Sequence, residues 1–248
     1  MPDLSPIRLF VLDLDGTVYI GDRLFDYSLD FLDSVRKAGK EYLFFTNNSS
    51  RSPAEYVKRL GSMGIPVTRK QIMTSGDVMI GYLKKHYPGA SVYLLGTPAL
   101  RESFEEEGIL LTENQPDIVV AAFDKTLTYE RLNNACRYIA RGALFMATHP
   151  DINCPAEDGF VVDCGAICAA ISCSTKRKPV VTGKPAPEVA EMIGDATGYR
   201  HEQIAFVGDL LMTDIAAGVN NGCSGLLVLS GATGMDDVQK SAIKPTMI

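Results

Sequence analysis

Short runs of β-branched and aromatic residues alternate with segments of helical apolar spacing from one end of the chain to the other. Short apolar runs bounded by turn residues are typical of strands, and their alternation with helices is typical of an α/β protein with a mostly parallel sheet. The predicted strands are residues 8–12, 41–45, 91–95, 117–123, 143–147, 179–181, 204–207 and 225–229.

Local signals mark several helix starts between these strands. Ser52-Pro53-Ala54-Glu55 combines a capping box with a proline in the first turn, and it predicts a helix that ends near residues 61–64. Thr97-Pro98 and Thr128-Tyr129-Glu130 predict similar starts, and Pro187 fits the first turn of a further helix. No repeat or long linker divides the chain, so a second domain would have to be inserted in the first through short connections.

Composition narrows the class of protein. The chain has 248 residues and a net charge of −6, which fits one large domain or two modest ones and disfavours nucleic acid or a membrane surface as a partner. The start of the chain has no basic segment typical of export, and the apolar run 118–123 is far shorter than a membrane span, so a cytoplasmic protein is expected. The six cysteines are expected to be reduced thiols; Cys164 and Cys168 are four apart on a predicted helix, but no C-x-x-C pair supports a metal site there.

The sharpest candidate for chemistry is Asp13-Leu14-Asp15-Gly16-Thr17, directly after the predicted strand 8–12. Side chains two apart in a strand point to the same side, so the carboxylates of Asp13 and Asp15 would converge at the C-terminal end of that strand. Ligands bind at this edge of open parallel sheets, and Gly16 lets the backbone turn without a side chain in the way. The alternative is that both aspartates only terminate the strand as turn residues.

Polar residues also follow three later strands. Thr46, Asn47 and Asn48 offer hydroxyl, amide and backbone N–H groups beside a helix start, which suits an anion, although ordinary N-capping explains them equally simply. Lys184 would supply a cation at another strand end, although most single lysines have no such role. Asp209 and Asp214 add carboxylates after the strand 204–207, and clustered carboxylates favour a cation such as Mg²⁺, which prefers oxygen ligands.

Together these four segments resemble the haloacid dehalogenase (HAD) superfamily, whose members share Asp-x-Asp, a Thr or Ser, a Lys and a late Gly-Asp-x-x-x-x-Asp in this order. The segments 46–49, 147–151 and 208–214 are similar to the NagD-like or 4-nitrophenylphosphatase-like branch, class IIA. This resemblance implies a Rossmann-like, doubly wound parallel-sheet core and an α/β cap inserted between the second and third motifs. The implied domains are a discontinuous core of residues 1–77 and 181–248 and a cap of residues 78–180.

The resemblance also implies the roles of the acidic residues. Asp13 would be the nucleophile that forms an aspartyl-phosphate, and Asp15 would be the general acid and base. Mg²⁺ would be held by the Asp13 carboxylate, the backbone carbonyl of Asp15 and Asp209. Asp214 would support Lys184 or a metal-bound water.

The phosphate and the substrate would be held by Thr46, Asn47, Asn48 and Lys184, and such positioning accounts for most phosphoryl-transfer catalysis. The implied activity is Mg²⁺-dependent hydrolysis of phosphate monoesters of small metabolites, either nucleoside monophosphates or sugar phosphates. A phosphomutase with the same intermediate and a non-catalytic binding or regulatory protein on a phosphatase scaffold are the alternatives. The expected partner is a small phosphate ester, and a homodimer through the cap is a further option.

The sequence departs from the branch at a few positions. Leu210 and Met212 stand where relatives usually carry polar residues, which affects contacts around the metal but not the metal ligands. His149 stands where relatives usually carry Asn, and it is expected to be a hydrogen-bonded residue at a strand end and not a catalytic one. The segment 151–160 and Asp124 are the expected determinants of substrate specificity.

Overall fold

The computed structural model of the protein describes residues 3–156 and 159–248, which form two compact units. The first, here called the core unit, comprises Met1–Thr46, Pro53–Met73 and Lys184–Ile248. The second, here called the cap unit, comprises Asn47–Ser52 and Thr74–Gly183, and it is inserted in the chain of the first. The predicted domain boundaries after residues 77 and 180 stay a prediction, because compactness alone does not show that either part folds by itself.

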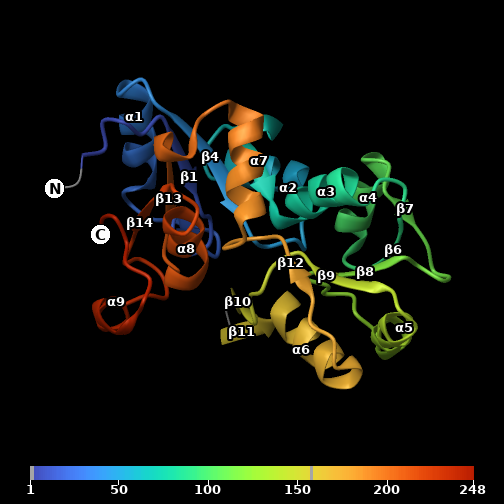
Figure 1. Cartoon of the computed structure of the whole chain (residues 1–248). Helices are drawn as coiled ribbons and strands as arrows, with labels where there is room; N and C mark the ends of the chain where they lie inside the picture. The colour runs from blue at the N-terminus through green and yellow to red at the C-terminus, as the bar shows by residue number, and fades with distance from the viewer. Residues whose placement is uncertain (1–2, 157–158) are drawn as a thin grey trace. The chain divides into compact units, whose positions relative to one another are not determined.

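The core unit is built on a five-stranded parallel sheet in the order β14-β13-β1-β4-β5 (Figure 1). Its strands are β1 (Leu9–Leu12), β4 (Glu41–Thr46), β5 (Ile72–Thr74), β13 (Ile204–Gly208) and β14 (Ser224–Leu227). A short antiparallel pair, β2 (Tyr19–Ile20) and β3 (Arg23–Leu24), follows β1. The helices are α1 (Ser28–Lys37), α2 (Pro53–Ser62), α7 (Pro187–Thr197), α8 (Ala216–Val219) and α9 (Met235–Lys240), with 3-10 turns at Arg69–Gln71 and His201–Gln203.

Every residue of β1 and β13 is buried, because helices cover both faces of the sheet. Phe10 and Leu12 point to the face on which Phe44, Tyr56 and Leu60 complete a hydrophobic cluster. This packing fixes the central strands firmly, so the polar residues that follow them start from a rigid edge.

The cap unit has its own five-stranded parallel sheet, in the order β12-β9-β8-β6-β7. Its strands are β6 (Ser91–Leu95), β7 (Leu110–Leu111), β8 (Ile118–Ala121), β9 (Leu144–Ala147) and β12 (Val180–Val181). The helices are α3 (Ser75–His86), α4 (Pro98–Glu106), α5 (Tyr129–Ala140) and α6 (Cys164–Thr175), and an antiparallel hairpin joins β10 (Asn153–Ala156) to β11 (Gly159–Val162).

Alternate residues of the cap strands enter two different hydrophobic clusters. Val119 and Ala121 of β8 pack with residues of α5 and α6, whereas Ile118 and Val120 pack with residues of α3 and α4. Since successive side chains of a strand point to opposite faces, the helices cover both faces of this sheet as well. The predicted α/β fold, with a Rossmann-like core and an inserted α/β cap, is confirmed.

All eight predicted strands occur, as β1, β4, β6, β8, β9, β12, β13 and β14. The predicted helix starts at Pro53, Pro98 and Tyr129 are also found, with Thr97 and Thr128 as N-caps. Except for β12, the strands of two or three residues were not predicted, and the segment 151–160, for which no strand was predicted, contains β10 and the beginning of β11. Glu157 and Asp158 of that segment lie outside the described residues.

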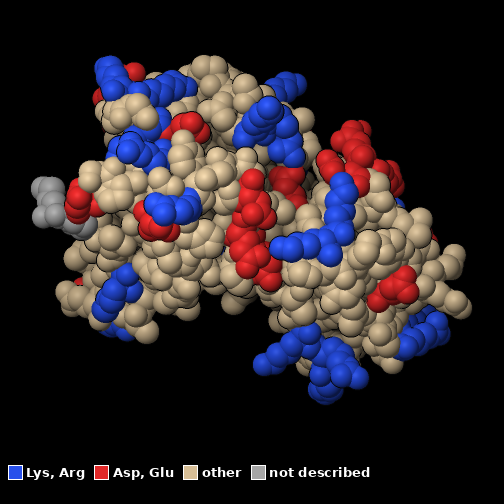
Figure 2. Space-filling model, turned by 45° about the horizontal axis from the view of Figure 1, so that its top comes forward, with Lys and Arg blue, Asp and Glu red and all other residues tan. Residues whose placement is uncertain are grey.

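Basic and acidic side chains are intermingled on the face shown in Figure 2 and do not gather into one extended basic surface. Within the described residues, no helix combines the length and the apolar character that crossing a membrane requires.

Candidate active site

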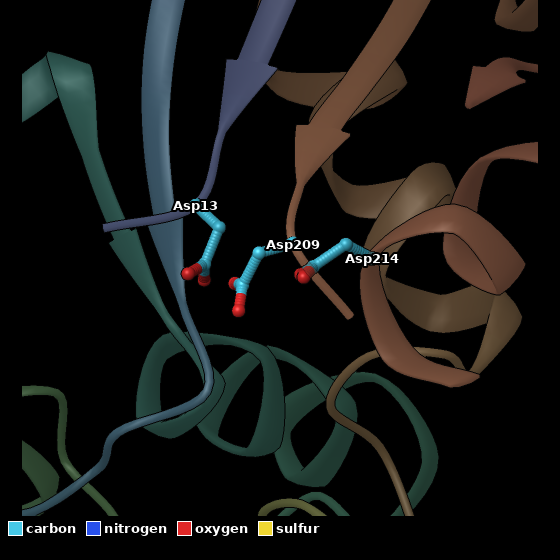
Figure 3. A group of neighbouring side chains, drawn as sticks. All are labelled: Asp13, Asp209 and Asp214. Atoms are coloured by element: carbon cyan, nitrogen blue, oxygen red, sulfur yellow. The ribbon is translucent and has the colours of Figure 1, made fainter. Parts of the chain in front are cut away.

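Three aspartate side chains converge at the C-terminal edge of the core sheet (Figure 3). Asp13 follows β1, Asp209 follows β13, and Asp214 lies in a π-helix, Leu211–Ile215, that precedes α8. One carboxylate oxygen from each lies within 4.8 Å of the others. The parallel pairing of Leu12 with Val207 explains the meeting of Asp13 and Asp209, because it aligns the ends of the two strands.

Lys184 joins this group as a buried cation. Its Nζ lies 2.5 Å from Asp13 Oδ1 and 2.6 Å from Asp214 Oδ1, and it also donates to the carbonyl oxygen of Phe45 at 3.3 Å. Burial lowers the pKa of Lys184, but the two carboxylates outweigh it and raise the pKa above its ordinary value. The lysine is therefore charged and connects β1, β4 and the π-helix.

Asp209 is held by backbone groups at very short range. The N–H of Ala232 donates to Asp209 Oδ2 at 2.7 Å, and the hydroxyl of Thr17 lies 3.4 Å from Asp209 Oδ1. A Cβ on Gly16 would lie 2.7 Å from Asp209 Oδ2, and a Cβ on Gly231 would lie 2.0 Å from the same atom. Gly16 also has a φ of 85°, so glycine is required there for both the turn and the close approach.

The segment 230–232 was not recognised from the sequence. Ser230 Oγ donates to the carbonyl oxygen of Gly16 at 2.7 Å, and the Tyr27 hydroxyl contacts Ser230 Oγ at 2.8 Å and donates to the Thr17 carbonyl at 2.6 Å. These bonds fix the turn after Asp13 against the segment that binds Asp209. The only sequence signal was a small-residue stretch after the last core strand, which is common in loops without any role.

Asp214 is held from two sides. Its Oδ2 accepts the N–H of Leu210 at 3.0 Å, while Oδ1 accepts from Lys184. The close packing of Gly208, whose Cβ would lie 2.2 Å from the Asp214 Cγ, leaves no room for a larger residue. Leu210 and Met212 are exposed, so Leu210 supports the group through its backbone and not through a polar side chain.

Keeping these carboxylates ionised at the same time is energetically unfavourable. Burial and the neighbouring charge of Asp214 raise the pKa of Asp209 to about 6. Burial raises the pKa of Asp13 well above its usual range, with Lys184 opposing and Asp214 and Asp209 adding to the shift. A divalent cation among these oxygens would favour the ionised forms, and an all-oxygen donor set suits a hard cation. Asp13, Asp209 and Asp214 are thus a candidate metal site.

The remaining predicted residues divide between the two units. Asp15 lies in the turn after Asp13, where its Oδ2 accepts from the Tyr19 hydroxyl at 3.5 Å. Thr46 is buried at the end of β4 in the core unit, whereas Asn47 and Asn48 belong to the cap unit.

Contacts within the cap unit place the other two predicted polar residues. Asn47 Nδ2 donates to Asp151 Oδ2 at 3.0 Å, and Asn48 Oδ1 accepts from the N–H of Ser50. Asp124 is buried in an ion pair with Arg131 at 2.7 Å, which supports a structural role for this residue rather than a role in specificity.

Comparisons with known proteins agree with this geometry. The family model described as haloacid dehalogenase-like hydrolase matches residues 10–110, and the HAD-hydrolase-like model matches residues 181–248. An acid sugar phosphatase of Staphylococcus aureus strain MRSA252 is 35% identical over 244 residues, which cover 98% of this chain and 94% of that protein. The chain belongs to the HAD-like hydrolases.

Solved structures place this HAD-like hydrolase in a particular branch. A 4-nitrophenylphosphatase from Thermotoga maritima is 44% identical with a TM-score of 0.95, covering 98% of this chain and 94% of that chain. NagD from E. coli K-12 is 29% identical with a TM-score of 0.90, covering 98% of this chain and 95% of that chain. The protein is therefore a HAD phosphatase of the NagD and p-nitrophenylphosphatase subfamily, a phosphoric monoester hydrolase, and the predicted family is confirmed.

Proposed function

We propose that the protein hydrolyses phosphate monoesters of small metabolites, with Mg²⁺ as cofactor and a phosphorylated Asp13 as intermediate. The observation that carries this proposal is the buried contact of Asp13 with Lys184 beside Asp209 and Asp214. The names of an acid sugar phosphatase and a 4-nitrophenylphosphatase among its relatives favour a sugar phosphate over a nucleoside monophosphate as the substrate. They also favour hydrolysis over the phosphomutase alternative.

In the first half-reaction, a carboxylate oxygen of Asp13 attacks phosphorus while the bond from phosphorus to the ester oxygen breaks. Asp15 gives its proton to the departing oxygen, so the alcohol leaves as a neutral molecule. In the second half-reaction, Asp15 takes a proton from water, and the water oxygen attacks the same phosphorus. Inorganic phosphate leaves, and the carboxylate of Asp13 is restored.

Lys184 and Thr46 would hold the transferring oxygens, together with Asn47 and Asn48, which follow Thr46 in the chain. The contact of Lys184 with Asp214 supports the predicted role of Asp214 in positioning this lysine. A charged lysine next to the nucleophile reduces the repulsion between the carboxylate of Asp13 and a phosphate dianion. Positioning and charge neutralisation of this kind provide most of the acceleration in phosphoryl transfer.

Asp13 and Asp209 would hold the metal, with the backbone carbonyl of Asp15 as a further ligand. The raised pKa of Asp209 supports this assignment, because the protein alone does not supply enough positive charge to keep this buried carboxyl group ionised. Bound Mg²⁺ would supply charge neutralisation for the nucleophile and the phosphate. Asp214 is close enough to join or replace a ligand, and its lysine contact favours the supporting role.

The test is phosphate release from p-nitrophenyl phosphate, hexose phosphates and nucleoside monophosphates, with and without Mg²⁺. Asp13→Asn keeps the size of the side chain but not the nucleophile, so turnover should fall by roughly 10⁴-fold or more, as for other covalent nucleophiles. Asp33→Asn is the matched control, because Asp33 is exposed on α1 and pairs with Lys37. Mg²⁺-dependent turnover retained by Asp13→Asn would refute the mechanism, and isomer without free phosphate from a hexose phosphate would indicate a mutase.

A further inference from the structure

His149 is a fully buried histidine with a carboxylate at each ring nitrogen. It follows β9 in the cap unit, and its Nδ1 lies 3.2 Å from Asp151 Oδ2. Its Nε2 lies 3.5 Å from Asp163 Oδ1, and Asp163 is the N-cap of α6, where it accepts the N–H of Cys164 at 2.5 Å. The sequence predicted a hydrogen-bonded histidine at a strand end; the residue does follow a strand, but within the described residues its ring nitrogens make ion-pair contacts and no hydrogen bond.

This arrangement fits the protonated ring. Neither ring nitrogen makes a hydrogen bond of ordinary geometry within the described residues, but each lies at ion-pair distance from a carboxylate. A protonated ring is attracted by both carboxylates, whereas a neutral ring is not. The negative groups around the ring are Asp151 after β9 and Asp163 and Cys164 at the start of α6. Burial would lower the pKa of His149, but these groups outweigh it and raise the pKa to about 9.

The charged ring in turn opposes the rise in pKa that burial causes in the neighbouring acidic groups. Burial raises the pKa of Asp163 to about 6, while His149 and, more weakly, Lys125 from the loop after β8 lower it. Burial raises the pKa of the Cys164 thiol, but the contacts of this thiol with Cys168, His149 and Thr148 outweigh burial and lower the pKa to about 7. The charged ring of His149 thus favours the ionised forms of Asp163 and Cys164.

The contacts extend from His149 to two other parts of the chain. Asp151 Oδ2, which faces the ring, also accepts from Asn47 Nδ2 at 3.0 Å. Gly183 fits against the same residues, since a Cβ there would lie 2.3 Å from the Thr148 carbonyl oxygen, 2.9 Å from Asn47 Oδ1 and 3.0 Å from the His149 Cβ. Asn47 directly follows Thr46 in the chain, and Gly183 directly precedes Lys184.

We propose that His149 is a positioning residue, a buried cation that fixes Asp151 and thereby Asn47 and Gly183, the chain neighbours of Thr46 and Lys184. This inference rests on the proposed function, because only there do Thr46, Asn47 and Lys184 hold the phosphate. His149 itself touches no reacting atom. It acts on phosphate binding through Asp151 and Asn47.

The charge is tested without any variant and without turnover. In the whole protein labelled with ¹⁵N-histidine, NMR should show both ring nitrogens of His149 protonated at pH 7.5 and losing a proton near pH 9. Assignment uses the spectrum of His149→Asn, and His86, which is exposed on α3, gives a separate internal signal. A neutral His149 ring at pH 7.5 would overturn the proposal.

The positioning role is tested by a double-mutant cycle with Asn47 and p-nitrophenyl phosphate as substrate. His149→Asn should raise KM about 10-fold, a coupling of the size found within one hydrogen-bond network, with a smaller change in kcat. The same change in an Asn47→Ala background should have little further effect, and His86→Asn should leave both constants unchanged. Fully additive effects of His149→Asn and Asn47→Ala would refute the positioning role.

Two further measurements test the proposal even if the His149 variant does not fold. If His149→Asn does not fold, Asp151→Asn enters the same cycle, because it removes the negative charge of the residue that contacts both the ring and Asn47 while keeping the size of the side chain. In the wild type, KM should rise as the pH passes about 9, and this rise should be absent when residue 149 is Asn. If Asp13→Asn remained active, the proposed function would fail, but the NMR result would still decide the state of His149.

Discussion

Replacing Lys184 by methionine removes one charge from the middle of the carboxylate group while keeping most of the length of the side chain. Lys184 is 2% exposed and lies within 2.6 Å of oxygens from both Asp13 and Asp214. Removing one partner of a buried ion pair typically costs about 3–5 kcal/mol, because the other charge stays buried without compensation. For a protein of this size that corresponds to a fall in Tm of roughly 6–20 °C.

The assay is thermal unfolding of Lys184→Met at pH 8 with a chelator present, against the wild type and Lys178→Met. Lys178 is exposed, so its replacement should leave the Tm almost unchanged. Saturating Mg²⁺ should raise the Tm of Lys184→Met more than that of the wild type, because the variant has no lysine to balance the carboxylates. Turnover should fall sharply in this variant even where Mg²⁺ restores its Tm.

Two results would refute this reasoning. If Lys184→Met melted within about 2 °C of the Lys178→Met control, the ion pairs of Lys184 would not contribute to stability as their burial implies. If Mg²⁺ stabilised the variant and the wild type equally, the lysine and the metal would not neutralise the same carboxylates. Acidification offers a second check, since protonating the carboxylates should reduce the difference between the variant and the wild type.

Three other predictions concern the metal and the cap. Gly231→Ala should weaken Mg²⁺ binding about 10- to 100-fold in calorimetry, because its Cβ would displace Asp209; Gly61→Ala, which has open space, should not. Mg²⁺ affinity should fall as the pH drops through about 6, where protons compete for Asp209; a pH-independent affinity would exclude Asp209 as a ligand. Arg131→Met should cost about 3–5 kcal/mol in urea unfolding by leaving Asp124 buried without its partner, yet keep the order of substrate preference; a reordered preference would assign Asp124 to specificity.

The pH dependence of the protein without metal follows from the same group. The pKa of Asp209 is raised to about 6 in the folded protein, above the ordinary value of 3.8. The folded state therefore binds this proton more tightly than the unfolded state does. Its stabilising contribution is fully present below pH 3.8 and is lost as the pH rises through about 6, so without a cation this group contributes least to stability at the pH values where Asp209 is ionised.

Much of the fold could be predicted because the long strands are apolar throughout. A strand such as β13 is buried on both faces of a parallel sheet, and it appears in the sequence as an uninterrupted apolar run before Asp209. The short strands β5 and β7 were missed because two or three residues carry too few positions for a clear pattern. The hairpin of β10 and β11 was missed because its residues are largely exposed and lack a buried face.

The residues with reactive side chains could be predicted for a different reason. Asp13, Lys184 and Asp209 occur in recognisable motifs at strand ends, and the parallel pairing of the strands brings those ends together. Ala232 and Gly231 could not be predicted as supporting groups, because neither acts through its side chain. Ala232 contributes an N–H group, and Gly231 contributes only the absence of a Cβ. Cys164, Asp151 and Asp163 favour the charged form of His149, and two of these three residues lie at the start of α6, which local sequence does not place beside the ring.

The glycines at 16, 208 and 231 share a property that links the energetics of the site to its chemistry. A Cβ at any of them would overlap the carboxylate of Asp209 or Asp214, so each allows the backbone to approach an acidic group more closely than another residue could. Hydrogen bonding to the charged form, as Ala232 does for Asp209, favours ionisation but does not overcome burial, since the pKa of Asp209 remains raised. The backbone thus holds the carboxylates in place without neutralising them. Neutralisation is left to Lys184 and, under the proposed function, to a metal ion, and binding that ion would stabilise the site.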